Sequence, residues 1–337
     1  MPLTLRFFMA WLLLTGCLPA MAHEFWLAAL PTGQPAQRTA ELSISVGEQW
    51  RGEKLPFTTE YIAQLRNYAC GTSQDLAPLL PGSNGGSDFA VQLQCGGTQL
   101  FALDSHPNVI TLPGDKFTAY LHDEGLDDII KQREAAGRAA TPGRERYRRH
   151  VKALLQASES AALISKTDKA DKAEKSAGRA TNASIQTGQK LEIIPLGDPS
   201  RLAAGSSMGF KLLFDGQALP NRLVKAWYRP VSKAASKAAI KAASKGASKG
   251  ASLGAEKAPN TESSDQTLII RGQTDSAGVI NFNFPYAGPW MISSVHMVAA
   301  SSADAVGAVP VDWDSYWGNL TFSLPGNASS TRLPQKN

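Results

Sequence analysis

The stretch MGFKLLFDGQALPNRLVKAWY, residues 208–228, decides the fold class. Two apolar runs, 208–214 and 222–228, flank Asp215-Gly216, a dipeptide that favours the tight turn of a β-hairpin. Similar short apolar runs lie on both sides of it, at residues 190–194, 267–270, 279–284, 290–298 and 320–324. About seven short strands with regular turn signals predict a β-sandwich of the immunoglobulin or transthyretin kind over residues 189–327.

The first half of the chain, residues 23–156, is also rich in strand patterns, so the whole protein is predicted to be mainly β. Apolar and polar residues alternate over residues 41–46, 89–93, 100–103 and 109–112. Over residues 115–135 the apolar residues recur at helical spacing, which predicts a helix. Asp115 is its candidate N-cap, and Gly125 is a candidate break within it. A second helix is predicted over residues 144–156, with its basic side chains on a solvated face. We therefore expect an N-terminal β-domain that carries a short helical pair.

The positive charge is concentrated in two low-complexity segments. The formal net charge is +5, but residues 231–259 alone, rich in Lys, Ala and Ser, carry +5. Residues 157–183 carry +1 and Arg6 another +1, which leaves −2 for the rest of the chain. Such segments bury too little apolar surface to offset the entropy of ordering, so we interpret them as a linker (157–188) and a loop within the sandwich (231–259). Because the basic charge lies outside the folded parts, the sequence does not indicate a nucleic-acid-binding protein. Residues 328–337 are expected to form a tail.

Residues 1–22 are typical of a secretory signal peptide. Arg6 is followed by an apolar run, and Ala20-Met21-Ala22 matches a cleavage site, so cleavage would make His23 the first residue of a periplasmic protein. An alternative is a bacterial lipobox ending at Cys17, which would then be acylated and anchor the chain to a lipid membrane.

The cysteine content fits export. Without the leader two cysteines remain, Cys70 and Cys95, each at the end of a strand-like run. Two cysteines in an oxidising compartment pair readily, which predicts a disulfide across a hairpin. A thiolate metal site is the alternative, but the spacing is not of a C-x-x-C type.

An ordered set of motifs runs through the chain and resembles the DUF4198 family of exported bacterial proteins. The motifs are His23–Leu27, Val46–Glu48, Arg51-Gly52, Leu112-Pro113, Lys116-Phe117, Ala119–Leu121, Glu124–Leu126, Arg144–Tyr147, Lys152–Gln156, Leu191–Leu196, Asp198-Pro199, Gly288–Trp290, His296-Met297, Asp312–Trp317 and Leu320–Phe322. Proteins of that family are often labelled as periplasmic components of nickel or cobalt uptake. The resemblance therefore implies a metal ion as ligand and a membrane transporter as partner, whereas the two low-complexity inserts depart from the family pattern.

A histidine at the mature N-terminus is a distinctive metal ligand. The α-amine of His23, with a pKa of about 7.7–8.0 in model peptides, and its Nδ1 atom can chelate one metal ion. A second imidazole would complete a three-nitrogen set that suits Cu(II) or Ni(II). We predict His296 as that second ligand and His122 as the next choice, whereas His106 and His150 are expected at the surface. Asp312 and Asp314 are candidates for oxygen ligands of the metal ion, or for hydrogen-bond acceptors that orient the ligating side chains.

The sequence favours a non-enzymatic protein. It contains no nucleophile-elbow, zinc-protease, phosphate-loop or dinucleotide-binding motif in a fitting context. Four tryptophans, Trp26, Trp290, Trp313 and Trp317, are interpreted as packing residues rather than as a sugar-binding platform. Two alternatives remain open: a metal-free sandwich that serves as a binding or scaffold module of the cell envelope, and a copper oxidase that uses the histidine pair.

Overall fold

The computed structural model describes residues 24–32, 38–157, 182–230, 267–301 and 310–326. The leader, Cys17, His23, most of the predicted linker, the Lys-rich insert and the tail lie outside the described residues. The described chain is mainly β, as predicted, with two α-helices and three sheets.

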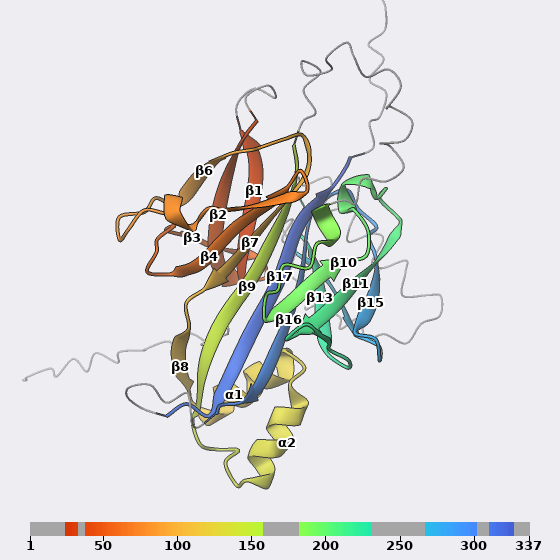
Figure 1. The fold of residues 1–337 in the computed structure, drawn as a ribbon. Helices are drawn as coiled ribbons and strands as arrows, with labels where there is room; N and C mark the ends of the chain where they lie inside the picture. Colours follow the sequence, from red (N-terminus) through yellow and green to blue (C-terminus); the bar gives the residue numbers. More distant parts are fainter. Residues whose placement is uncertain (1–23, 33–37, 158–181, 231–266, 302–309, 327–337) are drawn as a thin grey trace, which may run out of the picture.

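A large sheet forms the centre of the molecule and draws strands from both halves of the chain (Figure 1). Its path runs β14-β13-β16-β17-β9-β7-β4-β5, and β8 also pairs with β9. The bounds are β4 Ile62–Ala69, β5 Thr72–Asp75, β7 Gly97–Ser105, β8 Asn108–Leu112, β9 Gly143–Ala157, β13 Leu223–Tyr228, β14 Leu268–Gln273, β16 Gly288–Ala299 and β17 Trp313–Leu324. The two halves meet where β17 and β9 pair in parallel, so their strands share one sheet.

Two smaller sheets cover opposite faces of the large one. The first contains β1 Glu24–Thr32, β2 Thr39–Glu48, β3 Arg51–Leu55 and β6 Asp88–Gln92. The second contains β10 Leu191–Pro195, β11 Ser207–Phe214, β12 Gln217–Ala218 and β15 Val279–Asn283. Since successive side chains of a strand point to opposite faces, β17 contributes to both cores: Leu320 packs with the second sheet, and Thr321 contacts β1 of the first. The fold is therefore two sandwiches that share a central sheet.

The helical pair lies at one end of the large sheet, on the face that β1 also covers. Helix α1 spans Gly114–Asp123 and α2 spans Asp127–Ala135, which confirms the predicted helical segment and its break. Gly125, at the break, has φ +66°, and a Cβ there would meet Leu223 at 2.7 Å, so both conformation and space require glycine. Asp115 lies in the first turn of α1, whose N-cap is Pro113, so the predicted capping role was wrong. Short 3₁₀ turns, Ala77–Leu79, Asn182–Ser184 and Pro199–Arg201, complete the described elements.

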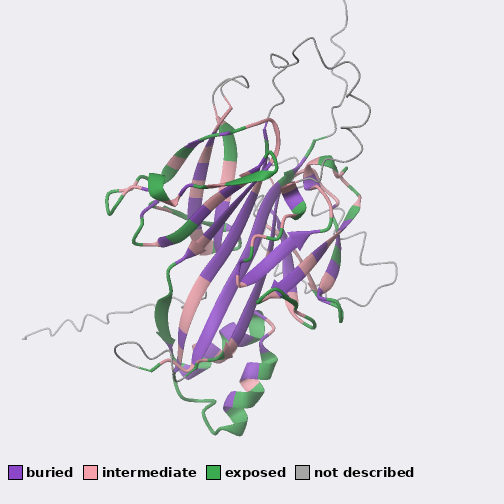
Figure 2. Cartoon of the chain, viewed as in Figure 1, coloured by how far each residue is buried: buried purple, intermediate pink, exposed green. Residues whose placement is uncertain are grey.

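The second predicted helix, residues 144–156, was wrong, because these residues form strand β9. This strand lies inside the sheet between β17 and β7. Figure 2 shows that most residues of the strand are buried. Its basic side chains do not form a solvated face: Arg149 is buried, and Lys152 is 1% exposed in an ion pair with Glu192. His150, predicted at the surface, is buried as well and bonds Asp104, whereas His106 is exposed as expected.

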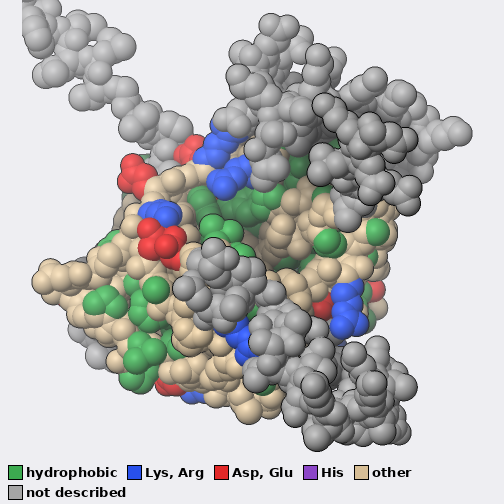
Figure 3. All heavy atoms as spheres, turned by 90° about the horizontal axis from the view of Figure 1, so that it is seen from above, with side chains coloured by type: hydrophobic (Ala, Val, Ile, Leu, Met, Phe, Trp, Pro, Cys, Tyr) green, Lys and Arg blue, Asp and Glu red, His purple; other side chains and the backbone are tan. Residues whose placement is uncertain are grey.

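Charged side chains of both signs lie side by side on the described surface, as the view from above shows (Figure 3). Hydrophobic side chains line a depression on this face. The four tryptophans Trp26, Trp290, Trp313 and Trp317 are all buried, in agreement with their interpretation as packing residues. Cys70 and Cys95 form a disulfide, which confirms the predicted pair. The predicted hairpin was wrong, because β4 pairs with β5 and β7 whereas β6 pairs with β2 in another sheet.

Candidate functional site

The first described strand, β1, is fixed to the large sheet at its very start. Asn319 Nδ2 donates a hydrogen bond to the Phe25 carbonyl, and Thr321 Oγ1 donates to the Leu27 carbonyl at 2.5 Å. Both donors project from β17 and are buried. Since β1 pairs only with β2 among the described strands, these side chains replace a second neighbouring strand. They hold Glu24, the residue that directly follows the predicted mature N-terminus, over the central sheet.

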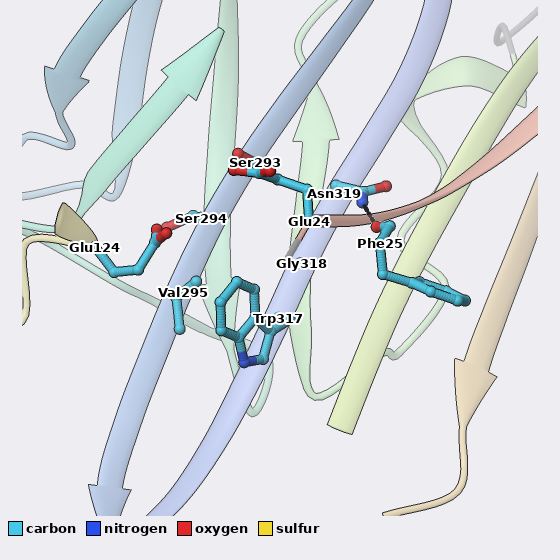
Figure 4. A pocket seen from close by; sticks show the side chains of 9 residues that line it. All are labelled: Glu24, Phe25, Glu124, Ser293, Ser294, Val295, Trp317, Gly318 and Asn319. Atoms are coloured by element: carbon cyan, nitrogen blue, oxygen red, sulfur yellow. Dashed lines mark hydrogen bonds between the residues drawn. The ribbon is translucent and has the colours of Figure 1, made fainter. Parts of the chain in front are cut away.

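A small polar pocket surrounds Glu24 (Figure 4). Its lining comes from the start of β1, from the end of α1 and from the middle of β16 and β17: Glu24, Phe25, Glu124, Ser293, Ser294, Val295, Trp317, Gly318 and Asn319. Two of the lining residues also carry a buried polar atom without a hydrogen-bond partner among the described residues, Trp317 Nε1 and Asn319 Oδ1. Buried polar atoms of this kind are normally satisfied by water or by a polar ligand.

The two glutamates of the pocket influence each other. Burial raises the pKa of Glu24 to about 7, and the nearby Glu124 carboxylate adds to the rise, while Lys225 opposes it. Burial also raises the pKa of Glu124, and the attraction of Lys225 only partly offsets this effect. Both groups therefore hold protons more tightly than ordinary glutamates do, and a bound cation would displace those protons.

Lys225 on β13 supplies the positive charge next to these carboxylates. Its Nζ atom donates to Glu124 Oε1 at 2.9 Å and to Asp123 Oδ2 at 3.4 Å. Burial would lower the pKa of Lys225, but the two carboxylates outweigh it and raise the pKa. The carboxyl groups of Glu24, Asp123 and Glu124 thus lie around the Lys225 ammonium group, and Arg271 lies 4.0 Å from Asp123.

His296, predicted as the partner of His23, lies on the other face of the large sheet from this pocket. Its ring packs against Phe214 of β11 at 4.4 Å between centroids, whereas its neighbour Val295 points to the pocket side. Burial, and then the charge of Arg222, lower the pKa of His296 to about 4, so the imidazole is neutral near pH 7. Its Nδ1 atom is buried without a hydrogen-bond partner among the described residues.

The other predicted ligands lie apart from Glu24. The side chain of His122 is 79% exposed at the end of α1, with Nδ1 3.0 Å from Asp127 Oδ1. Asp314 accepts hydrogen bonds from Arg146 and Arg148, and Asp312 from Arg138, so both aspartates take part in ion pairs. His296 and His122 do not lie together. Among the described residues, no three histidine, cysteine, aspartate or glutamate side chains form a group that could hold a metal ion.

Glu24, Glu124 and Lys225 were not predicted as site residues from the sequence. A signal was present for the two glutamates, because they belong to the motifs His23–Leu27 and Glu124–Leu126. Lys225 had no such signal, since a lysine inside an apolar strand pattern is usually an outward-facing residue. Only the antiparallel pairing of Lys225 with Ser293 places it beside the pocket.

Fold and pocket together define a mainly β protein in which a polar, carboxylate-lined pocket receives the start of the first strand. The chain belongs to the family described as Domain of unknown function (DUF4198), whose model matches residues 20–298. No curated protein matches the chain. Within the described residues, no helix is both long and apolar enough to cross a membrane.

Proposed function

We propose that this protein is exported and binds a divalent transition metal ion, nickel, cobalt or copper, for uptake or handling without catalysing a reaction. In this proposal it works in the periplasm after loss of residues 1–22, which frees the His23 α-amine, and passes the ion to a membrane transporter. Tethering through Cys17 would instead leave His23 internal, without that amine. One observation carries the proposal: Glu24, which directly follows His23, shares a polar pocket with Glu124.

The atoms around the pocket fit such an ion. Carboxylate oxygens of Glu24 and Glu124 and the unpartnered Oδ1 of Asn319 are oxygen donors. The α-amine and imidazole of His23 would add nitrogen donors one residue away in the sequence. Mixed nitrogen and oxygen donors bind first-row divalent ions with an affinity that rises from cobalt through nickel to copper. The site proposed here thus keeps His23 and replaces His296 by the pocket glutamates.

In this proposal, the hydrogen bonds of Lys225 change when the metal ion binds. A metal ion that takes an oxygen of Glu124 competes with the Lys225 ammonium group, which keeps Asp123 as its second partner. The ammonium group therefore balances the charge of the carboxylates while no metal ion is bound. It also limits the affinity of the site for the ion, because it competes for the same carboxylate oxygens.

Metal titration of the processed chain tests the proposal. We expect His23→Ala and Glu124→Gln each to weaken binding of Ni²⁺, Co²⁺ or Cu²⁺ by at least about tenfold in calorimetry. His296→Ala and His122→Ala serve as matched controls and should bind as the parent does. Unchanged binding by His23→Ala would overturn the proposal, and a loss in both His23→Ala and His296→Ala, but not in Glu124→Gln, would favour the His23–His296 pair instead.

The affinity should also depend on pH. Because the pKa of Glu24 is raised to about 7 and a free α-amine titrates at about 7.7–8.0, protons must leave both groups before a metal ion binds. We expect affinity to rise steadily from pH 6 to about pH 8, with proton release measurable in buffers of different ionisation enthalpy. An affinity that is flat over this range would contradict the assignment of these donors.

A metal-free binding or scaffold module remains the second candidate. The observation that favours it is the buried pair of Lys225 and Glu124, which is complete without a metal ion. For this candidate, all variants in the titration should bind metal ions equally weakly.

A further inference from the structure

Strand β8, Asn108–Leu112, is an edge strand with an apolar surface. Among the described strands it pairs only with β9, and Figure 1 shows no other strand along its outer side. Two adjacent residues, Val109 and Ile110, are exposed by 43% and 38%, and they are among the few large hydrophobic side chains exposed in the described chain. An open edge with such side chains is a template for pairing with another strand.

The backbone of β8 offers hydrogen-bonding groups on this edge. The Val109 N–H donates to the Asn108 side-chain oxygen at 2.8 Å, which indicates that it points away from β9. Since the direction of backbone groups alternates along a strand, the N–H and C=O groups of Thr111 point to the same side. Thr111 therefore presents a donor and an acceptor to an incoming strand. Val109 presents an acceptor, and its N–H can exchange the Asn108 oxygen for an acceptor on that strand.

We propose that β8 pairs with β8 of a second copy of the chain, antiparallel and with the two-fold axis at Ile110. In this register Val109 lies opposite the partner's Thr111, and their outward N–H and C=O groups form four hydrogen bonds across the axis. Ile110 lies opposite the partner's Ile110 in a non-hydrogen-bonded pair, where side chains approach most closely. The large sheets of the two copies would then form one continuous sheet.

The strand itself argues for a second copy as the occupant. Residues 109–111 are Val, Ile and Thr, which are all β-branched. In a pair of two β8 strands, β-branched residues would therefore face each other from both strands, and such side chains pack well on a pleated sheet. No acidic or basic residue occurs in Asn108–Leu112, so self-pairing sets no like charges of this strand opposite each other. A two-fold contact uses the same patch twice and closes after two copies, which shields both edges at once.

Sedimentation of the purified full chain at increasing concentration tests the proposal. The parent chain should form a dimer, and Ile110→Lys and Thr111→Pro should both sediment as monomers. Proline at position 111 removes only an N–H that points away from β9, so the strand should persist. Leu79→Lys, at a hydrophobic side chain that is 61% exposed elsewhere, is the matched control and should leave the dimer intact.

Crosslinking gives a second, independent measurement. Because Cα atoms of a non-hydrogen-bonded pair are about 4.5 Å apart, Ile110→Cys should form a disulfide-linked dimer under mild oxidation, whereas Leu79→Cys should not. A parent chain that stays monomeric at all concentrations, or a dimer that survives Ile110→Lys, would overturn the proposal. An Ile110→Cys chain that does not crosslink more than Leu79→Cys would equally overturn it.

Discussion

At the scale of single residues, another buried glutamate, Glu145, lies beneath α1. Burial raises the pKa of Glu145 to about 7, although the neighbouring Tyr120 hydroxyl and the charge of Arg149 lower it in part. Glu145 Oε2, Tyr120 Oη and Ser315 Oγ have no well-formed hydrogen bond in the described part of the chain. A carboxyl group in such surroundings is more stable protonated than charged.

This environment predicts how stability depends on pH. The pKa of Glu145 is raised from 4.5 to about 7 in the folded chain, so the folded state binds the proton more tightly than the unfolded state. Its contribution is present below pH 4.5 and is lost as pH rises through about 7. Glu145→Gln should therefore raise the free energy of unfolding at pH 8 by on the order of 3 kcal/mol and change little at pH 4.5.

Chemical denaturation of both chains at several pH values measures this difference. His296 contributes the opposite slope, since its pKa is lowered to about 4 and its stabilisation is lost as pH falls from 6.5 through 4. The comparison of Glu145→Gln with the parent cancels that background. A difference that is the same at pH 4.5 and pH 8 would rule out a raised pKa at Glu145.

At the scale of elements, β9 shows where the sequence was informative and where it was not. Helices 114–123 and 127–135 were predictable, because their apolar residues recur at helical spacing beside an exposed polar face. Strand β9 was not, because it is buried on both faces and the basic side chains on it resemble a solvated helix. The ion pair that accommodates Lys152 inside the molecule involves Glu192, forty residues later.

The candidate site illustrates the same limit. The sequence predicted His23 as a ligand, and Glu24 and Glu124 belong to recognised motifs, but no spacing rule brings the end of α1 next to the start of β1. The face on which His296 lies depends on its position within β16, which a sequence pattern leaves open when both faces are buried.

The buried pair of Lys152 and Glu192 joins β9 to β10. Lys152 Nζ lies 2.5 Å from Glu192 Oε1, and Glu192 also accepts hydrogen bonds from the Thr187 and Gly188 backbone. Removing one partner leaves the other charge uncompensated, so Lys152→Met should destabilise the chain by about 3–5 kcal/mol in denaturant unfolding.

A double variant separates charge from packing. Glu192→Gln keeps an oxygen acceptor for Thr187, so Lys152→Met combined with Glu192→Gln should recover most of the lost stability. If the double variant is as unstable as the sum of the single variants, the loss comes from packing rather than from a buried unpaired charge.

At the scale of the whole molecule, one sheet shared by both halves predicts that they unfold together. The parallel pairing of β17 with β9 places the C-terminal strand against the N-terminal half over nine residue pairs, Trp313 to Thr321. The disulfide between Cys70 and Cys95 therefore stabilises more than the N-terminal half that contains it. We expect its reduction to lower the free energy of unfolding by about 3 kcal/mol, with a single transition reported by both halves. Two separate transitions in tryptophan fluorescence and circular dichroism would contradict a shared sheet.

The positive net charge of the chain is unevenly distributed along the sequence. It belongs to Arg6 and to the low-complexity segments, whereas the described surface carries both signs side by side (Figure 3). Our central claim is instead a proposal: the buried carboxyl groups next to the predicted mature N-terminus take part in a metal site.

A single measurement tests that claim most directly: metal affinity of a chain that begins at His23, compared with the same chain carrying one glycine before His23. The extension keeps every side chain but removes the α-amine from its place next to the His23 imidazole. We predict that the chain beginning at His23 binds Ni²⁺ or Cu²⁺ at least about tenfold more tightly than the extended chain. Equal affinities would contradict a metal site built at the mature N-terminus.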